Sequence, residues 1–547
     1  MFDPKTSINF IEAIIQEDIN KGFPKEKLRF RFPPEPNGNL HIGHAKSICL
    51  NFGLAKKYSA PINLRFDDTN PTKEEKTYVN GIKNDIQWLG FSWNKESYAS
   101  DCFEKLYKWA VLLIKNGKAY IDEQAQNIIL KQRKTPFEPG IDSPYRSRPI
   151  EESLALFKKM KDGKFEEGKG VLRAKINMKS PNMNLRDPIM FRILKATIQR
   201  TKHNWSIFPI YDWAHGQSDL IEKISHSLCS LEFETHRPLY EWYLKNIKKQ
   251  EIPKQIEFAR LNLRYTIISK RKLYMIINDG FVEDWGDPRL LTLKSLRRKG
   301  FTSKSVLDFC HRIGYSKRDN LIDLSLLEFS IREQLNKIAI RVMVVLTPLR
   351  LVIENYPADR IEWLHAENNQ EDQKAGKRKI SISRKIFLDK KDFLVKATKN
   401  FHRLSIGKEV RLKNAYIIKG TGFRKKSTGN IIEISVVYDT KSRSGEEASI
   451  RKIKGTLHWV DAKPCFDVET RQYELLFSLE ITDERKYFLS FFNPHSLKIV
   501  HGYGESFLMQ ARLGELFQLQ RVGYFCVDQR GPRIIFNRTV SLRQSHL

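Results

Sequence analysis

The sequence has few cysteines, no long apolar run and a deficit of acidic residues. Its six cysteines are spread over 547 residues without a C-x-x-C pair. This spacing argues against a zinc knuckle or a disulfide framework and fits a reducing compartment. No stretch of 18 apolar residues occurs, and the N-terminal run MFDPKTSINFIEAIIQEDI is polar and acidic. We therefore expect neither a membrane span nor a signal peptide, and we predict a soluble cytoplasmic protein.

The deficit of acidic residues leaves a strongly basic chain. Lys and Arg number 95 against 64 Asp and Glu, a formal net charge of +31. A surplus of this size repels itself unless a polyanion shares the surface, which favours nucleic acid as a partner. Lysine is abundant throughout, so compositional drift explains part of the surplus. The length predicts about three to five domains with sizeable cores.

A strand, a tight turn and a helix are predicted around the first chemical motif. Apolar and charged residues alternate from Leu28 to Phe32, which is the period of a short strand, and Asn37-Gly38 is turn chemistry. The run LHIGHAKSICLNFGLAKKY that follows has helical spacing. A helix N-terminus offers backbone N–H groups and a positive dipole end to phosphate. His41 and His44, three residues apart, face the same way near that end.

The run RFPPEPNGNLHIGH, from Arg31 to His44, resembles the signature of class I aminoacyl-tRNA synthetases. In that family the two histidines bind the ATP phosphates as charge develops at the α-phosphate. The run FARLNLRYTIISKRKL, from Phe258 to Leu273, resembles the second signature, a mobile loop that closes over ATP. The resemblance implies ATP and Mg²⁺ as cofactors, with no metal ligand from the protein. It implies His41, His44 and Lys270 as catalytic residues, and ATP-binding residues Glu35, Asn37, His41, Gly43, His44, Ser269 and Lys270.

Two phosphate-handling motifs so far apart imply a nucleotide-binding fold that is split by an insertion. The predicted class is α/β: a split Rossmann-type catalytic domain, an inserted acceptor-binding domain, a helical subdomain and two C-terminal β-barrels. The expected boundaries are 1–110 and 206–265 for the catalytic halves, 111–205 for the insertion, 266–340 for the helical subdomain with the Ser-Lys loop, and 341–547 for the barrels. Phe103 to Lys115 is expected to be helical, and SPYRSRP is one of several strand-like runs in the insertion. Residues 366–379 are expected to form a loop between strands, and residues 421–430 a hairpin tip.

The choice of amino acid depends on wider resemblance. From Asn9 almost to Arg543 the chain is similar to glutaminyl-tRNA synthetases, whose nearest relatives use glutamate. A glutamate pocket needs a cation, whereas a glutamine amide needs neutral donors and acceptors. Cys229 stands where the glutamate enzymes usually carry arginine. The resemblance implies that Asp67 binds the α-amino group and Tyr211 the side-chain amide, within a set of amino-acid-binding residues comprising Arg31, Asp67, Tyr211, Cys229 and Gln255.

The predicted function is ATP-dependent activation of L-glutamine and its transfer to the 3′-terminal ribose of glutamine tRNA, by a monomer that binds no membrane. Arginine and glutamine side chains read splayed bases of RNA loops. The positions that match the family's anticodon readers are Arg341, Arg403, Arg411, Gln518 and Arg521. Six positions depart from the family pattern, namely Asn39, Lys223, Thr235, Ile268, Ile340 and His402. Two alternatives remain: a glutamate-charging or dual-specificity enzyme, and a catalytically inactive tRNA-binding paralogue.

Overall fold

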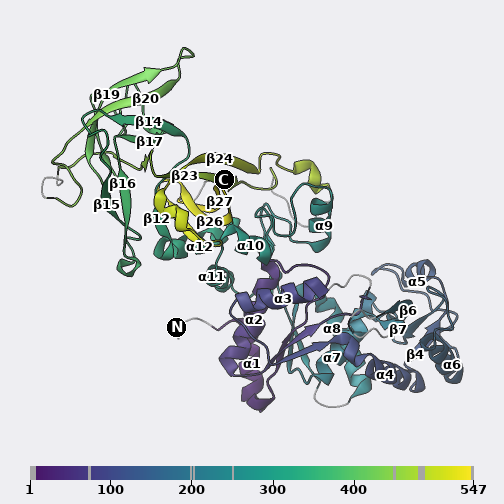
Figure 1. Ribbon diagram of the computed structural model, residues 1–547. Coiled ribbons are helices and arrows are strands. Elements are labelled where there is room, and N and C mark those ends of the chain that lie inside the picture. The colour runs from purple at the N-terminus through teal and green to yellow at the C-terminus, as the bar shows by residue number, and fades with distance from the viewer. Residues whose placement is uncertain are drawn as a thin grey trace. The chain divides into compact units, whose positions relative to one another are not determined.

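The computed structural model describes residues 8–71, 76–197, 200, 204–248, 252–446, 451–478 and 487–543 (Figure 1). The chain divides into two compact units, one of Met1–Asn262 with Cys310–Leu321 and the other of Leu263–Phe309 with Ile322–Leu547. In the described ranges, no helix combines the length and apolar character that crossing a membrane requires.

The first unit is built on parallel strands covered by helices. Three strands form a parallel sheet in the order β1-β2-β3, and β8 pairs with β9, also in parallel. Backbone hydrogen bonding between Ser225 and Arg29, at 3.1 Å, ties the start of β8 to the start of β1. Because parallel neighbours need crossover connections, helices alternate with these strands. The elements are α1 (Phe10–Asn20), β1 (Phe30–Phe32), α2 (Ile42–Tyr58), β2 (Ile62–Phe66), α3 (Lys76–Trp88), β3 (Lys95–Tyr98), α7 (Tyr211–Ile221), β8 (His226–Ser230), α8 (Arg237–Ile247) and β9 (Lys254–Phe258).

An antiparallel sheet lies between the two sets of parallel strands in the sequence. Its order is β4-β5-β6-β7, and three helices accompany it. The elements are α4 (Phe103–Lys115), β4 (Ala119–Asp122), α5 (Gln126–Arg133), α6 (Ile150–Lys161), β5 (Val171–Ala174), β6 (Ile189–Thr197) and β7 (Asn204–Pro209). The helix predicted from Phe103 to Lys115 is confirmed at both ends. The strand predicted at SPYRSRP is wrong, because the chain turns at residues 144–147 and Pro149 caps α6.

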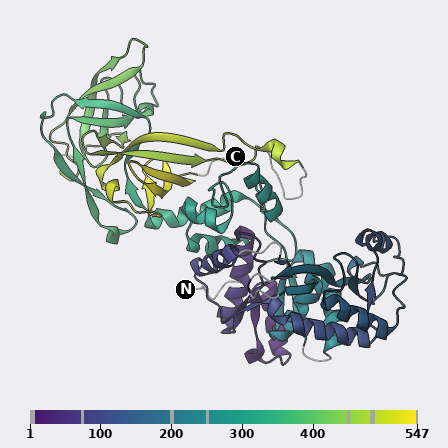
Figure 2. The ribbon, with the colours of Figure 1, turned by 45° about the vertical axis from the view of Figure 1, so that its right-hand side comes forward.

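The second unit holds helices followed by two seven-stranded, barrel-like sheets (Figure 2). One sheet runs β12-β25-β26-β27-β23-β24-β13 and the other β21-β18-β19-β20-β14-β17-β22. The helices of this unit are α9 (Lys270–Asn278), α10 (Leu293–Lys299) and α12 (Leu324–Ile338). The helix α11 (Ser303–Ile313) begins in this unit, and its last residues from Cys310 belong to the first unit. The first sheet consists of β12 (Ile340–Val342), β13 (Val344–Val345), β23 (Cys465–Tyr473), β24 (Leu497–Glu505), β25 (Leu516–Leu519), β26 (Gly523–Arg530) and β27 (Ile534–Ser541). The other consists of β14 (Pro348–Ile353), β17 (Lys385–Asp389), β18 (Glu409–Leu412), β19 (Ile417–Lys425), β20 (Ile431–Tyr438), β21 (Thr456–Leu457) and β22 (Val460–Asp461).

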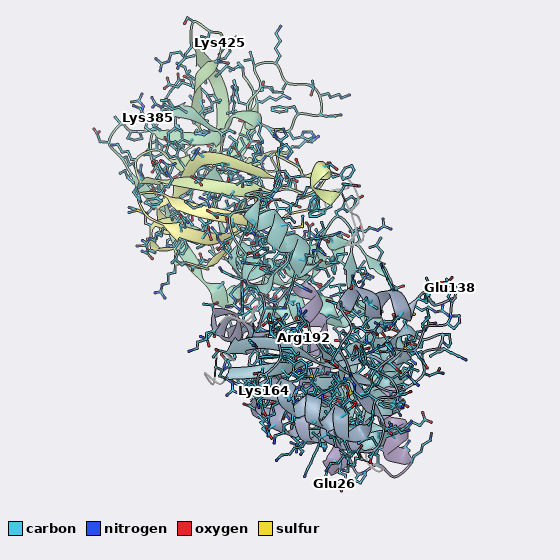
Figure 3. The ribbon with its side chains drawn as sticks, turned by 90° about the vertical axis from the view of Figure 1, so that its right-hand side faces the viewer. Glu26, Glu138, Lys164, Arg192, Lys385 and Lys425 are labelled. Atoms are coloured by element: carbon cyan, nitrogen blue, oxygen red, sulfur yellow. The ribbon has the colours of Figure 1, made fainter. Side chains whose placement is uncertain are left out.

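Two smaller pairs of strands complete the elements. β10 (Asn262–Leu263) pairs with β11 (Leu321–Ile322), and β15 (Glu362–Glu367) pairs with β16 (Lys377–Ile382). The expected loop at 366–379 is confirmed only in its centre, since Ala366 pairs with Arg378 inside the β15–β16 ladder. The expected hairpin tip at 421–430 is likewise shorter, because β19 continues to Lys425 and the turn spans 426–430. Figure 3 labels Lys425 near the free end of this hairpin.

Candidate active site

Two histidines cap the first turn of α2. His41 is the N-cap residue, and its Nδ1 accepts a hydrogen bond from the backbone N–H of Gly43 at 3.1 Å. The Nδ1 of His44 accepts the backbone N–H of His41, also at 3.1 Å. The ring centroids are 3.8 Å apart. The prediction that both rings lie together at the helix end is confirmed.

These capping bonds determine which nitrogen of each ring carries the proton. Because Nδ1 acts as an acceptor, the neutral imidazole holds its hydrogen on Nε2. Each ring of His41 and His44 therefore offers an Nε2–H donor at the positive end of the α2 dipole. In the segment between β1 and α2, the side-chain amide of Asn37 donates to the carboxylate of Glu35. The first turn of α2 therefore has donors suited to phosphate, and the part of Glu35 and Asn37 in ATP binding stays a prediction.

Ser269 and Lys270 belong to the second unit. Ser269 is the N-cap residue of α9, and Lys270 is the first residue of that helix. The segment before them is anchored by Ile267, which is 5% exposed within an apolar cluster. Their part in ATP binding stays a prediction.

Arg31 lies inside the first unit, where it contributes to a buried ionic network. Its side chain is 0% exposed, because buried carboxylates balance its charge. Asp219 accepts from Nε of Arg31 at 3.2 Å and lies 2.8 Å from Nη2 of Arg65. Arg65 also pairs with Glu222 at 3.3 Å. Two arginines and two carboxylates therefore compensate each other.

Cys229 lies directly beside this network. Nη2 of Arg31 is 3.6 Å from Sγ of Cys229 and donates to Oγ of Ser227 at 2.6 Å. Burial raises the pKa of the Cys229 thiol, which keeps it neutral. Burial by itself raises the pKa of Asp219, but Arg31 and Arg65 outweigh it and hold that pKa well below its ordinary value. Asp219 is therefore ionised and neutralises the arginines behind Cys229.

Asp67 follows β2 and carries a buried carboxylate with one unbonded oxygen. It is 7% exposed, and among the described residues its Oδ1 has no hydrogen-bond partner. Burial raises the pKa of Asp67 to about 7, against the lowering effect of Arg65. A buried carboxylate with one oxygen left unbonded favours a cationic ligand. This geometry fits the predicted contact with a substrate ammonium.

Tyr211 and Gln255 are placed by neighbouring elements. The Tyr211 ring stacks on His215 with centroids 5.0 Å apart, and burial raises the pKa of Tyr211 well above its ordinary value. Burial also lowers the pKa of His215 to about 3, so this ring is neutral. Gln255 lies on β9, and its Nε2 donates to Glu257 at 3.0 Å. Tyr211 therefore presents a neutral hydroxyl close to the network that holds Arg31.

Sequence reasoning missed most of the residues that hold Arg31. Asp219, Arg65 and Ser227 were not assigned roles, although Asp219 follows His215 by one helical turn in a block that resembles the family. Asp219 also accepts the hydroxyl of Tyr240 at 3.2 Å. No short-range pattern marks these partners, because the burial of Arg31, which calls for a carboxylate partner, is seen only in the structure.

The predicted anticodon residues fall into separate groups in the second unit. Arg341 and Gln518 are register partners between β12 and β25. Gln518 donates to the hydroxyl of Tyr524 at 2.9 Å, and Tyr524 donates to Asn336, which also accepts from Arg341 at 3.2 Å. The structure thus brings Arg341 and Gln518 together through two residues that the sequence did not reveal.

Arg403 and Arg521 form a second group around Asp392. Arg521 makes two hydrogen bonds to this carboxylate, at 2.6 and 2.9 Å, and Arg403 approaches it at 3.3 Å. Arg411 lies on β18. It donates to the carbonyl of Ser442 at 3.1 Å, and burial, followed by repulsion from Arg451, lowers its pKa.

Three of the departures from the family pattern occupy ordered places. Lys223 has φ +57°, a left-handed conformation that favours glycine. Thr235 accepts Nδ2 of Asn182 at its carbonyl, at 2.8 Å, and Nδ2 of Asn184 at its hydroxyl, at 3.2 Å. Ile340 is the first residue of β12. Of these, Lys223 alone carries a backbone penalty.

Comparison with protein families gives matches over most of the chain. The catalytic domain of the class I (E and Q) tRNA synthetases matches residues 27–337. Two anticodon-binding domains of the same class match residues 339–439 and 456–528. A glutamine–tRNA ligase of Salmonella newport is 49% identical over 541 residues, which is 98% of this chain and 97% of that protein. The glutamine–tRNA ligase of Salmonella typhimurium has the same identity and coverage. A solved glutamate tRNA ligase from Elizabethkingia meningosepticum is 14% identical with a TM-score of 0.42, covering 57% of this chain and 70% of that one.

Proposed function

The chain belongs to the class I tRNA synthetases for glutamate and glutamine, and from this membership we propose how its residues charge tRNA. It is an aminoacyl-tRNA synthetase, a ligase that attaches glutamine to tRNA. The proposal concerns the residues that carry out this reaction and the basis of the choice of glutamine.

In the proposed first step, the glutamine carboxylate attacks the α-phosphate of ATP and pyrophosphate leaves. No protein nucleophile is needed, because the substrate supplies the attacking oxygen. We propose that the Nε2–H groups of His41 and His44 donate to the phosphates as negative charge develops there. Lys270 is proposed to neutralise charge on the triphosphate. In the second step, the terminal ribose hydroxyl of tRNA attacks the acyl carbon and AMP leaves.

Magnesium is proposed to enter with ATP. When bound, it neutralises phosphate charge and orients the triphosphate. Among the described residues, Asp389, Asp392 and His458 are the group spaced for a metal ion, and they belong to the barrel region of the second unit. The histidine cluster at α2 supplies donors, which suit phosphate oxygens and not a cation. The proposed metal is therefore held by ATP oxygens and water.

Asp67 is proposed to bind the α-ammonium group of glutamine. Its buried carboxylate and orphaned Oδ1 match a cation, and the ammonium would stabilise the ionised form. Tyr211 is proposed to hydrogen-bond the side-chain amide, with Gln255 nearby on β9. As a neutral hydroxyl, Tyr211 can both donate and accept, which an amide requires.

The observation that supports a preference for glutamine over glutamate as substrate is the charge balance behind Cys229. Arg31 and Arg65 are matched by Asp219 and Glu222, and all four are buried. A glutamate carboxylate beside Cys229 would therefore meet a neutral network and lose its hydration without a counter-charge. Such a penalty amounts to about 2–4 kcal/mol in a partly buried site.

The tRNA-binding part of the proposal rests on the second unit. Arg341 with Gln518, and Arg403 with Arg521, are proposed to bind bases of the anticodon loop, with Arg411 contacting the same loop. We further propose, on the family resemblance, that the enzyme acts as a monomer. The net charge of +31 supports binding to a polyanion such as tRNA. The affinity of the protein for tRNA should then fall as the salt concentration rises.

A charging assay tests the proposal. Glutamine tRNA, ATP and magnesium are incubated with labelled glutamine or labelled glutamate, using the wild-type protein, His41→Ala and Lys270→Ala. We expect glutamine-only charging that falls by about two to three orders of magnitude in each variant. Comparable charging with glutamate would support the dual-specificity alternative. Tight tRNA binding without charging in the wild type would support the inactive paralogue.

A further inference from the structure

A buried carboxylate joins two arginines from different sheets of the second unit. Asp392 is 0% exposed and lies in the segment between β17 and β18. Arg521, in the turn between β25 and β26, holds both of its carboxylate oxygens. Arg403, in the loop before β18, places Nε at 3.3 Å from Oδ1 and donates from Nη1 to the carbonyl of Lys391 at 2.9 Å. One anion therefore orients two guanidinium groups.

The two arginines differ from Asp392 in being accessible. The side chains of Arg403 and Arg521 are 39% and 31% exposed, while that of Asp392 is 0% exposed. A guanidinium has five N–H donors in a rigid fork, and a carboxylate engages only part of them. The pairing fixes the direction of each fork and leaves donors at the surface.

Arg521 occupies a costly backbone position. Its φ is +65°, in the left-handed region where glycine is favoured and where other residues lose about 1 kcal/mol or more. A residue that keeps its side chain under such a penalty indicates a need for that side chain. The two hydrogen bonds to Asp392 require an arginine at this turn.

A nearby ion pair shows what a purely structural contact looks like. Arg378 and Glu505 also connect the β15–β16 hairpin to the other sheet, with Nη2 to Oε2 at 3.1 Å. Their side chains are 3% and 6% exposed. The Arg378 side chain is therefore too buried to contact a ligand, in contrast to those of Arg403 and Arg521.

The same surroundings exclude a metal site at Asp392. Asp389, Asp392 and His458 bring their ligand atoms within 4.8 Å of one another. However, Arg521 takes both oxygens of Asp392, and its Nη1 lies 3.2 Å from Nδ1 of His458. The guanidinium occupies the place that a cation would need.

We propose that Asp392 is a positioning residue for tRNA recognition, which aligns Arg403 and Arg521 so that the two arginines read neighbouring anticodon-loop nucleotides as one unit. This inference rests on the proposed function, because it takes both arginines to be tRNA contacts. Asp392 itself touches no substrate. Its loss frees both guanidinium groups, so one substitution weakens two contacts.

The test is a double-mutant cycle on tRNA charging. The kcat/KM for an in vitro transcript of glutamine tRNA is measured for wild type, Asp392→Asn, Arg521→Gln and the combination. Asp392→Asn should raise KM for tRNA by about tenfold or more with little change in kcat. Arg521→Gln should then cost much less in the Asp392→Asn background than in the wild type. Glu505→Gln is the matched control, since it removes another buried carboxylate bonded to an arginine and should lower thermal stability without raising KM.

The outcomes distinguish the positioning role of Asp392 from the proposed tRNA contacts of Arg403 and Arg521. If Arg521→Gln and Arg403→Gln leave KM for tRNA unchanged, the assignment of these arginines as tRNA contacts is wrong, and the inference falls with it. If they raise KM but Asp392→Asn does not, or if the effects simply add, only the positioning role is overturned. Should Asp392→Asn fail to fold, Arg521→Lys decides: it keeps the charge but not the paired hydrogen bonds. A KM near that of Arg521→Gln supports positioning, and a wild-type KM refutes it.

Discussion

Replacing Asp219 with asparagine changes the charge behind the amino-acid pocket while keeping its shape. The substitution removes one of two carboxylates that balance Arg31 and Arg65. It leaves a net positive charge next to Cys229, whose Sγ lies 3.6 Å from Nη2 of Arg31. A glutamate carboxylate in contact with that sulfur would lie roughly 7 Å from the guanidinium. At an effective dielectric constant of about 20, the attraction is about 2 kcal/mol, which corresponds to roughly thirtyfold in affinity.

The assay is the ratio of kcat/KM for glutamate to that for glutamine. We expect Asp219→Asn to raise this ratio by about thirtyfold, chiefly through a lower KM for glutamate. Glu222→Gln is the control, because it removes the same charge but contacts Arg65 and not Arg31. Its effect on the ratio should be several times smaller. Both variants lose stability, by about 3–5 kcal/mol where a buried pair is broken, so folding is verified by circular dichroism first.

One result would refute the reasoning. A folded Asp219→Asn protein with an unchanged ratio of glutamate to glutamine charging would mean that the charge of this network does not reach the substrate. An equal rise in Glu222→Gln would mean that total charge matters and proximity to Cys229 does not.

Four further predictions concern Asp67, Lys223 and Tyr524. Because burial raises the pKa of Asp67 to about 7, its carboxylate becomes protonated as the pH falls below that value. Below pH 7, KM for glutamine should therefore rise about tenfold per pH unit. A KM that stays constant between about pH 5.5 and 7 would contradict this prediction. Because the pKa of Asp67 is about 4 in the unfolded chain and higher in the folded protein, the folded state loses stability as the pH rises from about 4 to about 7. Above pH 7, Asp67→Asn should therefore unfold at a higher temperature than the wild type. Lys223→Gly should stabilise the first unit by about 1 kcal/mol, since φ is +57°, whereas Lys21→Gly, at φ −82°, should not; calorimetry distinguishes them. Tyr524→Phe should raise KM for tRNA by up to about tenfold with kcat unchanged, because its hydroxyl links Gln518 to Asn336.

Local pattern predicted the elements that bear the chemistry, and it failed where the partners are remote in sequence. The turn at Asn37-Gly38 and the helix beginning with the histidine pair follow from short-range propensities, so His41 and His44 were placed well. The burial of Arg31 depends on Asp219, which is 188 residues away. No periodicity in β1 encodes that pairing, because alternation within a strand reports only on neighbouring positions. Resemblance to a family identified Arg31 and Cys229, but the compensating charges required the structure.

The two carboxylates that sequence reasoning overlooked perform opposite tasks by the same physics. Asp219 and Asp392 are both 0% exposed, and each binds two arginines from distant segments. The side chains of Arg31 and Arg65, which contact Asp219, are only 1% and 3% exposed. Buried carboxylates neutralise their charge, so this network is neutral overall. Around Asp392 the side chains of Arg403 and Arg521 are about one-third exposed, so part of each guanidinium reaches the surface. Exposure of the guanidinium groups, and not the pairing itself, therefore distinguishes the proposed exclusion of a charged substrate at Asp219 from the proposed binding of tRNA at Asp392.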